Sequence, residues 1–308
     1  MEQVPQYASS LSLIEGDHIY VIGGVKPDGS HSSLIHRYTD TWTRLMASNL
    51  DLFPQRASHC GFITNGWIYT YGGQEESKTT ESKIYGSWLR INVDDLQWEN
   101  YIEEGRFPSR HSASCVYSQE LKMALVYGGL IPQDIVDDLL ILNLENREFF
   151  LQRTTGNHPK VFMHTAVLHK RNMYVFGGIR DNGEPSAELF KLSLDSWEWQ
   201  SLGKFMDEGV EMKFCGHSAG IWNDRMVVYG GFDGSSKMYN QFFVYSFEDN
   251  KWGRIHEKKT PRFCGNMIVK DNEEILLIGG YNLLTRQIPS HVDVVRMSEI
   301  GSFIEVFE

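Results

Sequence analysis

Short apolar runs that end in a pair of glycines recur six times along the chain. They read YVIGG, YTYGG, LVYGG, YVFGG, VVYGG and LLIGG, and their first glycines are separated by 49, 56, 49, 53 and 49 residues. A period near 50 residues is typical of a repeat architecture in which each unit is one supersecondary structure. The paired glycines are Gly23, Gly24, Gly72, Gly73, Gly128, Gly129, Gly177, Gly178, Gly230, Gly231, Gly279 and Gly280.

The pattern around each glycine pair predicts four short strands per unit. The first strand starts at a small-residue segment with histidine, the second is the apolar run, the third alternates, and the fourth follows an aromatic residue. The histidines are His59, His111, His164 and His217, with Ser10 and Asn266 at that position in the first and last units. The aromatics are Trp42, Trp98, Phe149, Trp199 and Trp252, with Phe303 expected in the last unit.

The local pattern of two segments is ambiguous, and comparison with the equivalent segments of the other units resolves it. The histidine position precedes the first glycine by 13 residues in five units and by 17 in the third, which predicts a four-residue extension near Ser118–Met123. Residues 134–149 have leucines and isoleucines at a spacing compatible with a helix, but the equivalent segments of other units alternate and are rich in strand-forming residues. We therefore predict a strand there.

Units of four strands stack radially as the blades of a β-propeller, because one such unit cannot bury both of its faces alone. The predicted fold is all-β: one six-bladed propeller over residues 1–308, with four contiguous strands in every blade. The first and last blades should meet by side-chain packing alone, and this junction should be the weakest. The expected blades are residues 5–48, 54–104, 108–155, 159–204, 213–258 and 261–307.

The glycine pair after an apolar strand, followed 19 to 26 residues later by an aromatic, resembles the kelch family over nearly the whole chain. The glycines are expected to allow a kink and a close backbone approach. The aromatic residues are expected to pack one blade against the next. Both sets are therefore interpreted as structural residues.

Composition narrows the function classes. Apolar residues make up 41% of the chain and aromatic residues 13%, enough for a large core, and no apolar run approaches the length of a membrane span. The formal net charge of −11, without a cluster of basic residues, argues against nucleic acid and membrane surfaces as partners. Four cysteines without a C-x-x-C pair, and an N-terminus without a basic leader segment, predict a cytoplasmic or nuclear protein.

Candidate catalytic chemistry is sparse. The four histidines could converge on the channel as metal ligands, but one ion requires ligands about 2 Å away, so we interpret them as packing residues. Cys215 and Cys264 could be neighbours in adjacent blades, and we interpret them as core thiols. The E-x-x-x-D element of the iron-associated kelch-type specifier proteins is missing, as are H-E-x-x-H and a phosphate-binding glycine loop. We predict no enzyme activity, no cofactor and no metal.

The resemblance to kelch proteins implies a binding face made by the loops at one end of the channel. Arginines beside aromatic residues there would suit peptide carboxylates or acidic side chains. Further loop candidates are Glu75, Glu76, Lys78, Asp181, Phe232 and Arg286, and the polar loop over residues 74–83 is interpreted as a tolerated insertion. The predicted binding residues are Tyr7, Arg56, Arg110, Phe162, Arg180, Phe214, Asp233, Arg262, Phe263 and Tyr281.

We therefore expect a protein- or peptide-binding module. Blades four and five look most like stand-alone kelch-domain proteins, several of which are substrate receptors of cullin ubiquitin ligases. Two departures stand against this assignment: no segment remains for a BTB, F-box or cullin box, and Phe214 occupies the place of a carboxylate-binding arginine. A scaffold or trafficking effector, and a small-molecule enzyme of the propeller type, remain alternatives.

Overall fold

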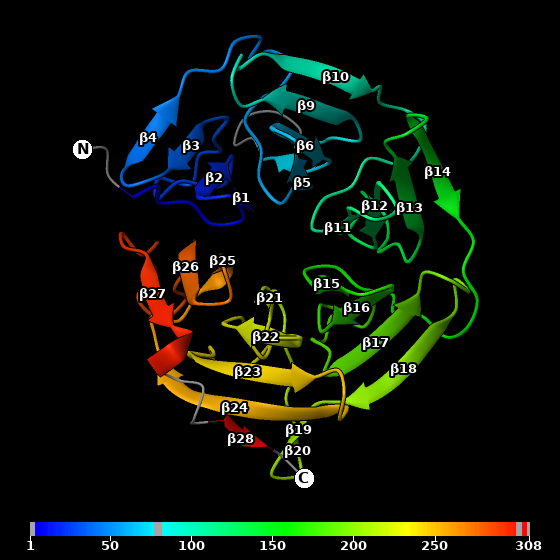
Figure 1. Cartoon of the computed structure of the whole chain (residues 1–308), viewed down its shortest axis with the longest axis vertical. Coiled ribbons are helices and arrows are strands. Elements are labelled where there is room, and N and C mark those ends of the chain that lie inside the picture. The colour runs from blue at the N-terminus through cyan, green and yellow to red at the C-terminus, as the bar shows by residue number, and fades with distance from the viewer. Residues whose placement is uncertain (1–3, 77–81, 300–303, 307–308) are drawn as a thin grey trace.

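Six antiparallel sheets surround a central axis in the computed structural model (Figure 1). The structure describes residues 4–76, 82–299 and 304–306. Within these ranges the chain is almost entirely strand and loop, with one 3-10 turn, η1, at Met297–Glu299. The predicted all-β, six-bladed propeller is confirmed, and residues 139–143 and 148–152 are strands rather than a helix.

The first four blades each consist of four consecutive strands, apart from one added hairpin in blade two. Blade one contains β1 (Leu11–Glu15), β2 (His18–Ile22), β3 (Ile35–Tyr38) and β4 (Trp42–Leu45). Blade two contains β5 (Cys60–Thr64), β6 (Trp67–Tyr71), β9 (Trp88–Asn92) and β10 (Trp98–Ile102), with the hairpin β7 (Gln74–Glu75) and β8 (Lys83–Ile84). Blade three contains β11 (Ser114–Ser118), β12 (Met123–Tyr127), β13 (Leu139–Asn143) and β14 (Glu148–Gln152). Blade four contains β15 (Thr165–His169), β16 (Asn172–Phe176), β17 (Glu188–Ser193) and β18 (Trp199–Lys204).

The last two blades depart from the expected strand count. Blade five contains β21 (Ser218–Trp222), β22 (Arg225–Tyr229), β23 (Gln241–Ser246) and β24 (Lys251–Lys258), preceded by the hairpin β19 (Met206–Asp207) and β20 (Val210–Glu211). Blade six contains β25 (Phe263–Lys270), β26 (Glu274–Tyr281) and β27 (Asp293–Arg296). The strand β28 (Ile304–Val306) pairs with β24 of blade five. The expectation that this segment completes blade six is therefore wrong, and Phe303 lies outside the described residues.

The repeat register also needs one correction. The turn between the first two strands has two residues in blades one, two, four and five, four in blade three and three in blade six. The extension in blade three is therefore two residues rather than four. Ala113 and Gly265, instead of His111 and Asn266, are equivalent to His59, because each lies against the second glycine of its own blade.

A closed ring of backbone hydrogen bonds joins all six blades around the channel. Each N–H donates to the carbonyl of the preceding blade, over 2.7–3.1 Å, and each participating residue has a φ between 50° and 59°. The ring includes the junction of the first and last blades, where Ser9 N–H donates to the Cys264 carbonyl. Packing alone therefore does not close the propeller. The ring residues are Ser9, Ser58, Ser112, Met163, Gly216 and Cys264.

A second set of hydrogen bonds explains the glycine pairs. The second glycine of every pair donates its N–H to a carbonyl of the next blade, as Gly178 does to Phe214 over 2.8 Å. Gly178 has a φ of 88°, and a Cβ there would lie 2.7 Å from the His164 Cβ. Only glycine fits this combination of backbone conformation and close approach.

The aromatic residues at the start of the fourth strands pack against the preceding blade. Phe149 meets Tyr71 with ring centroids 5.4 Å apart, and Trp252 meets Phe176 at 4.7 Å. All of these side chains are buried. The core therefore consists of apolar layers between neighbouring blades, as the repeat predicts.

Candidate functional site

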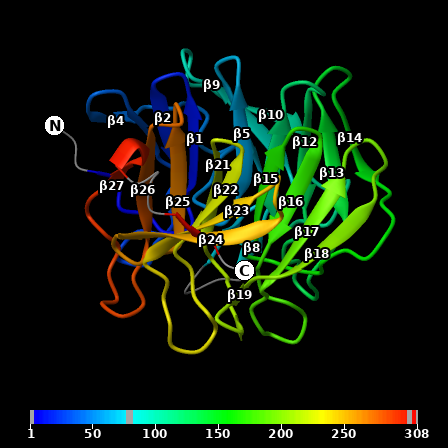
Figure 2. The same cartoon turned by 60° about the horizontal axis from the view of Figure 1, so that its bottom comes forward.

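A pocket of about 840 Å³ opens at one end of the channel, among the loops of blades six, one and two. Figure 2 shows that the long loops after β22 and β26 project from one end of the propeller. The pocket is called the mouth pocket below. Its volume lies within the range of about 300–1,000 Å³ found for ligand-binding cavities.

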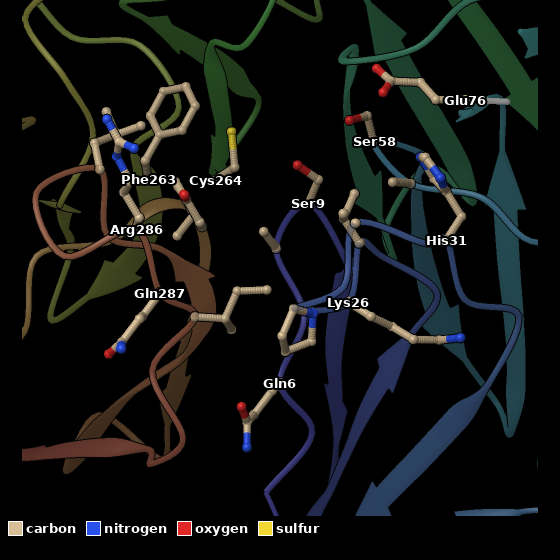
Figure 3. A pocket seen from close by; sticks show the side chains of 18 of the residues that line it. Gln6, Ser9, Lys26, His31, Ser58, Glu76, Phe263, Cys264, Arg286 and Gln287 are labelled. Atoms are coloured by element: carbon tan, nitrogen blue, oxygen red, sulfur yellow. The ribbon is translucent and has the colours of Figure 1, made fainter. Parts of the chain in front are cut away.

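The mouth pocket combines an apolar lining with polar groups on its walls (Figure 3). Val25 and Pro27 come from the blade-one loop, Leu283 and Ile288 come from the blade-six loop, and Phe263 lies at the start of β25. Two residues of the hydrogen-bond ring, Ser9 and Ser58, also line it. The charged residues of the lining are Lys26, Glu76 and Arg286.

Three of the predicted binding arginines are buried instead of lining the pocket. The exposed fractions of Arg56, Arg110 and Arg262 are 1%, 0% and 2%. Each guanidinium donates to the carbonyl of the first glycine of its own blade, at Gly72, Gly128 and Gly279. Their backbone carbonyls accept hydrogen bonds from the preceding blade. The predicted rim role is therefore corrected, because these side chains tie blades together inside the protein.

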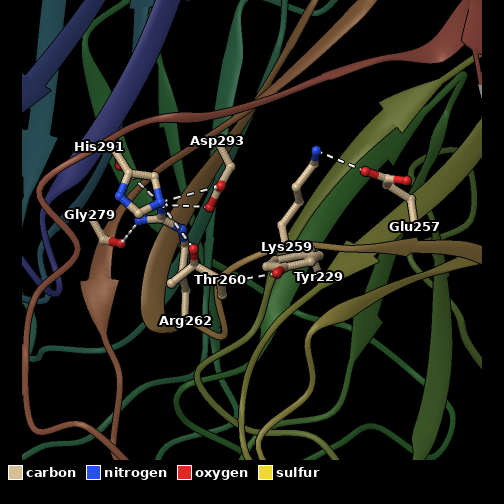
Figure 4. A network of polar contacts seen from close by, with 8 residues as sticks. All are labelled: Tyr229, Glu257, Lys259, Thr260, Arg262, Gly279, His291 and Asp293. Atoms are coloured by element: carbon tan, nitrogen blue, oxygen red, sulfur yellow. Dashed lines mark hydrogen bonds and ion pairs between the residues drawn. The ribbon is translucent and has the colours of Figure 1, made fainter.

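The environments of the three arginines differ in charge. Arg262 donates to the Asp293 carboxylate over 2.8 Å and to the His291 carbonyl over 3.0 Å (Figure 4). Arg110 is paired with Asp138 through both of its terminal nitrogens. Arg56 has an aromatic ring as its neighbour, and burial lowers the pKa of its guanidinium to about 10.

Of the remaining predicted binding residues, Phe263 and Tyr281 line the mouth pocket, as do Glu76 and Arg286 from the further loop candidates. Tyr7 and Phe214 are buried between blades, so their predicted binding role is also corrected. Phe162, Arg180 and Asp233 are half-buried on other loops. Arg180 faces Glu188 at 3.6 Å, and Asp233 accepts hydrogen bonds from the N–H groups of its own turn. Lys78 lies outside the described residues.

The sequence pattern missed several residues of the pocket. His31, Met163, Gln6 and Gln287 line it but are not among the residues predicted from the sequence. Met163 is the ring residue of blade four, so the corrected register would have indicated it. His31 is 4% exposed and belongs to the blade-one loop, which has no regular signature in the sequence.

The histidines of the repeat are packing residues, and two of them contact hydroxyl groups of the preceding blade. His164 Nε2 lies 2.8 Å from the Ser114 hydroxyl of the preceding blade, and His217 Nε2 lies 2.8 Å from the Thr165 hydroxyl. Burial lowers the pKa of His164 to about 4 and the pKa values of His59 and His217 to about 3. These rings are therefore neutral at pH 7. No cluster of three or more metal-ligating side chains occurs in the described part of the chain.

The four cysteines are free thiols. Burial raises the pKa of Cys215 to about 12 and that of Cys264 to about 11, and Cys264 adds its own charge to the effect on Cys215. Thiols with raised pKa values are poor nucleophiles at neutral pH. Within the described ranges, no helix has the length and apolarity required to span a bilayer.

Comparisons with known proteins match this architecture. Residues 118–298 match the model of the KLHDC2/KLHL20/DRC7 Kelch-repeats domain. The chain is 24% identical to Kelch domain-containing protein 2 of Bos taurus, over 91% of this chain and 78% of the relative. It is 23% identical to Kelch domain-containing protein 1 of Homo sapiens, over 87% of this chain and 74% of the relative. The structure of YjhT superimposes with a TM-score of 0.79 at 14% identity, covering 100% of this chain and 99% of that chain.

The fold defines a six-bladed β-propeller with a loop-lined pocket at one end of its channel. The family model matches more than half of the chain, and this match assigns the family. This chain belongs to the kelch-repeat family.

Proposed function

We propose that the propeller binds a segment of a partner protein in the mouth pocket and recognises an acidic group of that segment through Arg286. The open pocket, with its apolar lining and a guanidinium on its wall, is the observation that carries this proposal. Arg286 is exposed and has no ion-pair partner among the residues the structure describes. A free guanidinium suits the carboxylate of a side chain or of a chain terminus.

A role as the substrate-recognition adaptor of a ubiquitin ligase is the more specific form of the proposal. It rests on the resemblance to kelch-domain receptors and on the open pocket. In this form, the chain works in the cytoplasm or nucleus and reaches a ligase through a further protein. Affinity purification from cell extract, with the Arg286→Ala variant beside the native chain, tests it. The proposal expects a cullin-ligase component with both proteins and loss of the client with the variant only.

Binding itself is tested with peptides selected by the native chain from a displayed library. We expect Arg286→Ala to raise the Kd about ten- to a hundredfold, because one charge-assisted hydrogen bond contributes about 1.5–3 kcal/mol. Added salt should also weaken binding. The matched control is Arg44→Ala, an exposed arginine on the outer strand of blade one. Equal weakening by both variants would place the ligand away from the mouth pocket.

A further inference from the structure

We infer that the ligand of the mouth pocket is an extended segment with an acidic group at one end, a basic group at the other and apolar residues between them. This inference rests on the proposed function and adds the second charged contact. Its basis is a pair of opposite charges that the pocket holds apart. The two charged residues are Arg286 and Glu76.

The Arg286 end is a loop held by the hydrogen bonds of Asn282, and its cation makes no ion pair with the described residues. Asn282 is buried and accepts hydrogen bonds from the N–H groups of Leu284 and Thr285, over 3.0 and 3.2 Å. Its own N–H donates to the Gln287 carbonyl over 2.8 Å. Arg286 lies in this turn with a φ of 56°, and the neighbouring Leu284 is 70% exposed. The turn therefore presents a cation and an apolar side chain at the pocket edge.

The Glu76 end carries a carboxylate that makes no ion pair with any residue that the structure describes. In the described part of the chain, its one hydrogen-bond partner is the Gln74 amide, at 3.4 Å. The charge of Glu76 acts on His31 and His111, but burial outweighs it and lowers the pKa of both rings. Neutral rings do not compensate a carboxylate. The pocket therefore offers a counter-charge for an ammonium or guanidinium group of a ligand.

The two charges face each other across the pocket. Figure 3 shows Arg286 beside Phe263 on one side and Glu76 above Ser58 on the other. Opposite charges within contact distance would pair with each other, and no such pair occurs between these two residues. The apolar lining lies between the two walls. Lys26 lines the same pocket, but its ammonium is a point charge and matches a carboxylate less well than the planar guanidinium fork of Arg286.

The other side of the mouth provides a contrast. There Lys213 pairs with Glu184 at 3.3 Å, and Lys204 pairs with Glu211 at 2.5 Å. In the mouth pocket, Arg286 and Glu76 make no ion pair with the described residues. The formal net charge of −11 also attracts the basic end of a ligand over a longer range.

A charge-swap selection tests the inference. The full-length chain and its Glu76→Lys, Arg286→Glu and doubly swapped variants each select from one displayed library of random seven-residue peptides. The native chain should enrich peptides with one acidic and one basic residue separated by apolar residues. Each single variant should lose one charge preference and keep the other. The double variant should enrich peptides in which the two charges have exchanged positions.

The controls are Arg44→Glu on the outer strand of blade one and Glu248→Lys on the opposite face of the propeller. Both should select like the native chain. Enrichment of acidic peptides that only Arg286→Glu alters would overturn the two-charge inference and leave the proposed function intact. Enriched peptides that none of the mouth variants alters would overturn both.

Discussion

The guanidinium of Arg56 lies 4.0 Å from the centroid of the Tyr85 ring, whereas the equivalent Arg110 pairs with Asp138. The Tyr85 hydroxyl donates to the Glu75 carboxylate over 2.8 Å, so the negative charge near Arg56 lies one residue further away. Both arginines occupy the same position in their blades. The buried charge of Arg56 in blade two is therefore stabilised by an aromatic face, and that of Arg110 in blade three by a direct ion pair.

This contrast predicts the effect of removing the carboxylate. Asp138→Asn should lower the free energy of unfolding by about 3 kcal/mol, because it leaves the Arg110 charge buried without a counter-ion. Urea titration at pH 7 measures the change. Glu145→Gln is the control, since Glu145 is exposed and pairs with the exposed Lys122; it should cost less than about 1 kcal/mol. Equal losses would mean that the buried pair contributes no more than a surface pair.

An alanine should lower the free energy of unfolding more at a crowded glycine of a glycine pair than at a glycine with open surroundings. Gly178→Ala should destabilise by about 3 kcal/mol or more, because its Cβ would meet His164 and the Phe162 carbonyl within 2.8 Å. Gly183 has a φ of 79° and an open surrounding, so Gly183→Ala should cost only about 1–2 kcal/mol of backbone strain. Melting temperatures compare the two variants. A smaller loss for Gly178→Ala would contradict the close approach between strands.

The buried histidines predict a loss of stability in mild acid. Their folded-state pKa values of about 3 to 4 lie below the ordinary value of 6.5, so the unfolded chain binds more protons between these limits. The stabilising effect is complete above pH 6.5 and decreases as the pH falls. Each histidine should contribute up to about 1.4 kcal/mol per pH unit. Urea titrations from pH 6.5 to 5 measure the slope.

A variant separates the histidines from other titrating groups. His164→Gln should reduce the slope between pH 6.5 and 5 by about one proton, because glutamine does not titrate there. His18→Gln serves as the control at the start of β2, where the side chain is exposed. An unchanged slope for His164→Gln would show that His164 is not held neutral in the folded protein.

The junction between the first and last blades predicts a local difference in opening. The chain does not connect these blades through a loop, so the amides of Ser9 and Gly280 should exchange faster than those of Ser112 and Gly129. All four make the same kinds of inter-blade hydrogen bond. Hydrogen exchange followed by mass spectrometry compares them. Equal protection would show that the hydrogen-bond ring closes the propeller as firmly as the connecting loops do.

The sequence alone determined the architecture. Six glycine pairs at a regular period and the aromatic residues that follow them specify the propeller, because each unit must bury both faces against its neighbours. Phe149 shows this well: it is the second residue of the fourth strand of its blade and packs on Tyr71 of the preceding blade, as the repeat requires. Phe263 and Tyr281, at strand ends, were also identified from the pattern and line the pocket, as do the loop candidates Glu76 and Arg286.

The tertiary structure decided which charges are available to a ligand. Arg110 and Arg286 both lie in loop segments of the sequence, but Arg110 is buried by a glycine carbonyl and by Asp138 from further along the chain. Burial depends on such distant partners, which a local pattern does not contain. The same reason applies to Ile304–Val306, whose alternation fits a fourth strand of blade six. In the structure this strand pairs with β24 of blade five instead of with blade six. Both sheet edges are available to it only once the propeller has assembled, so the sequence pattern does not decide between them.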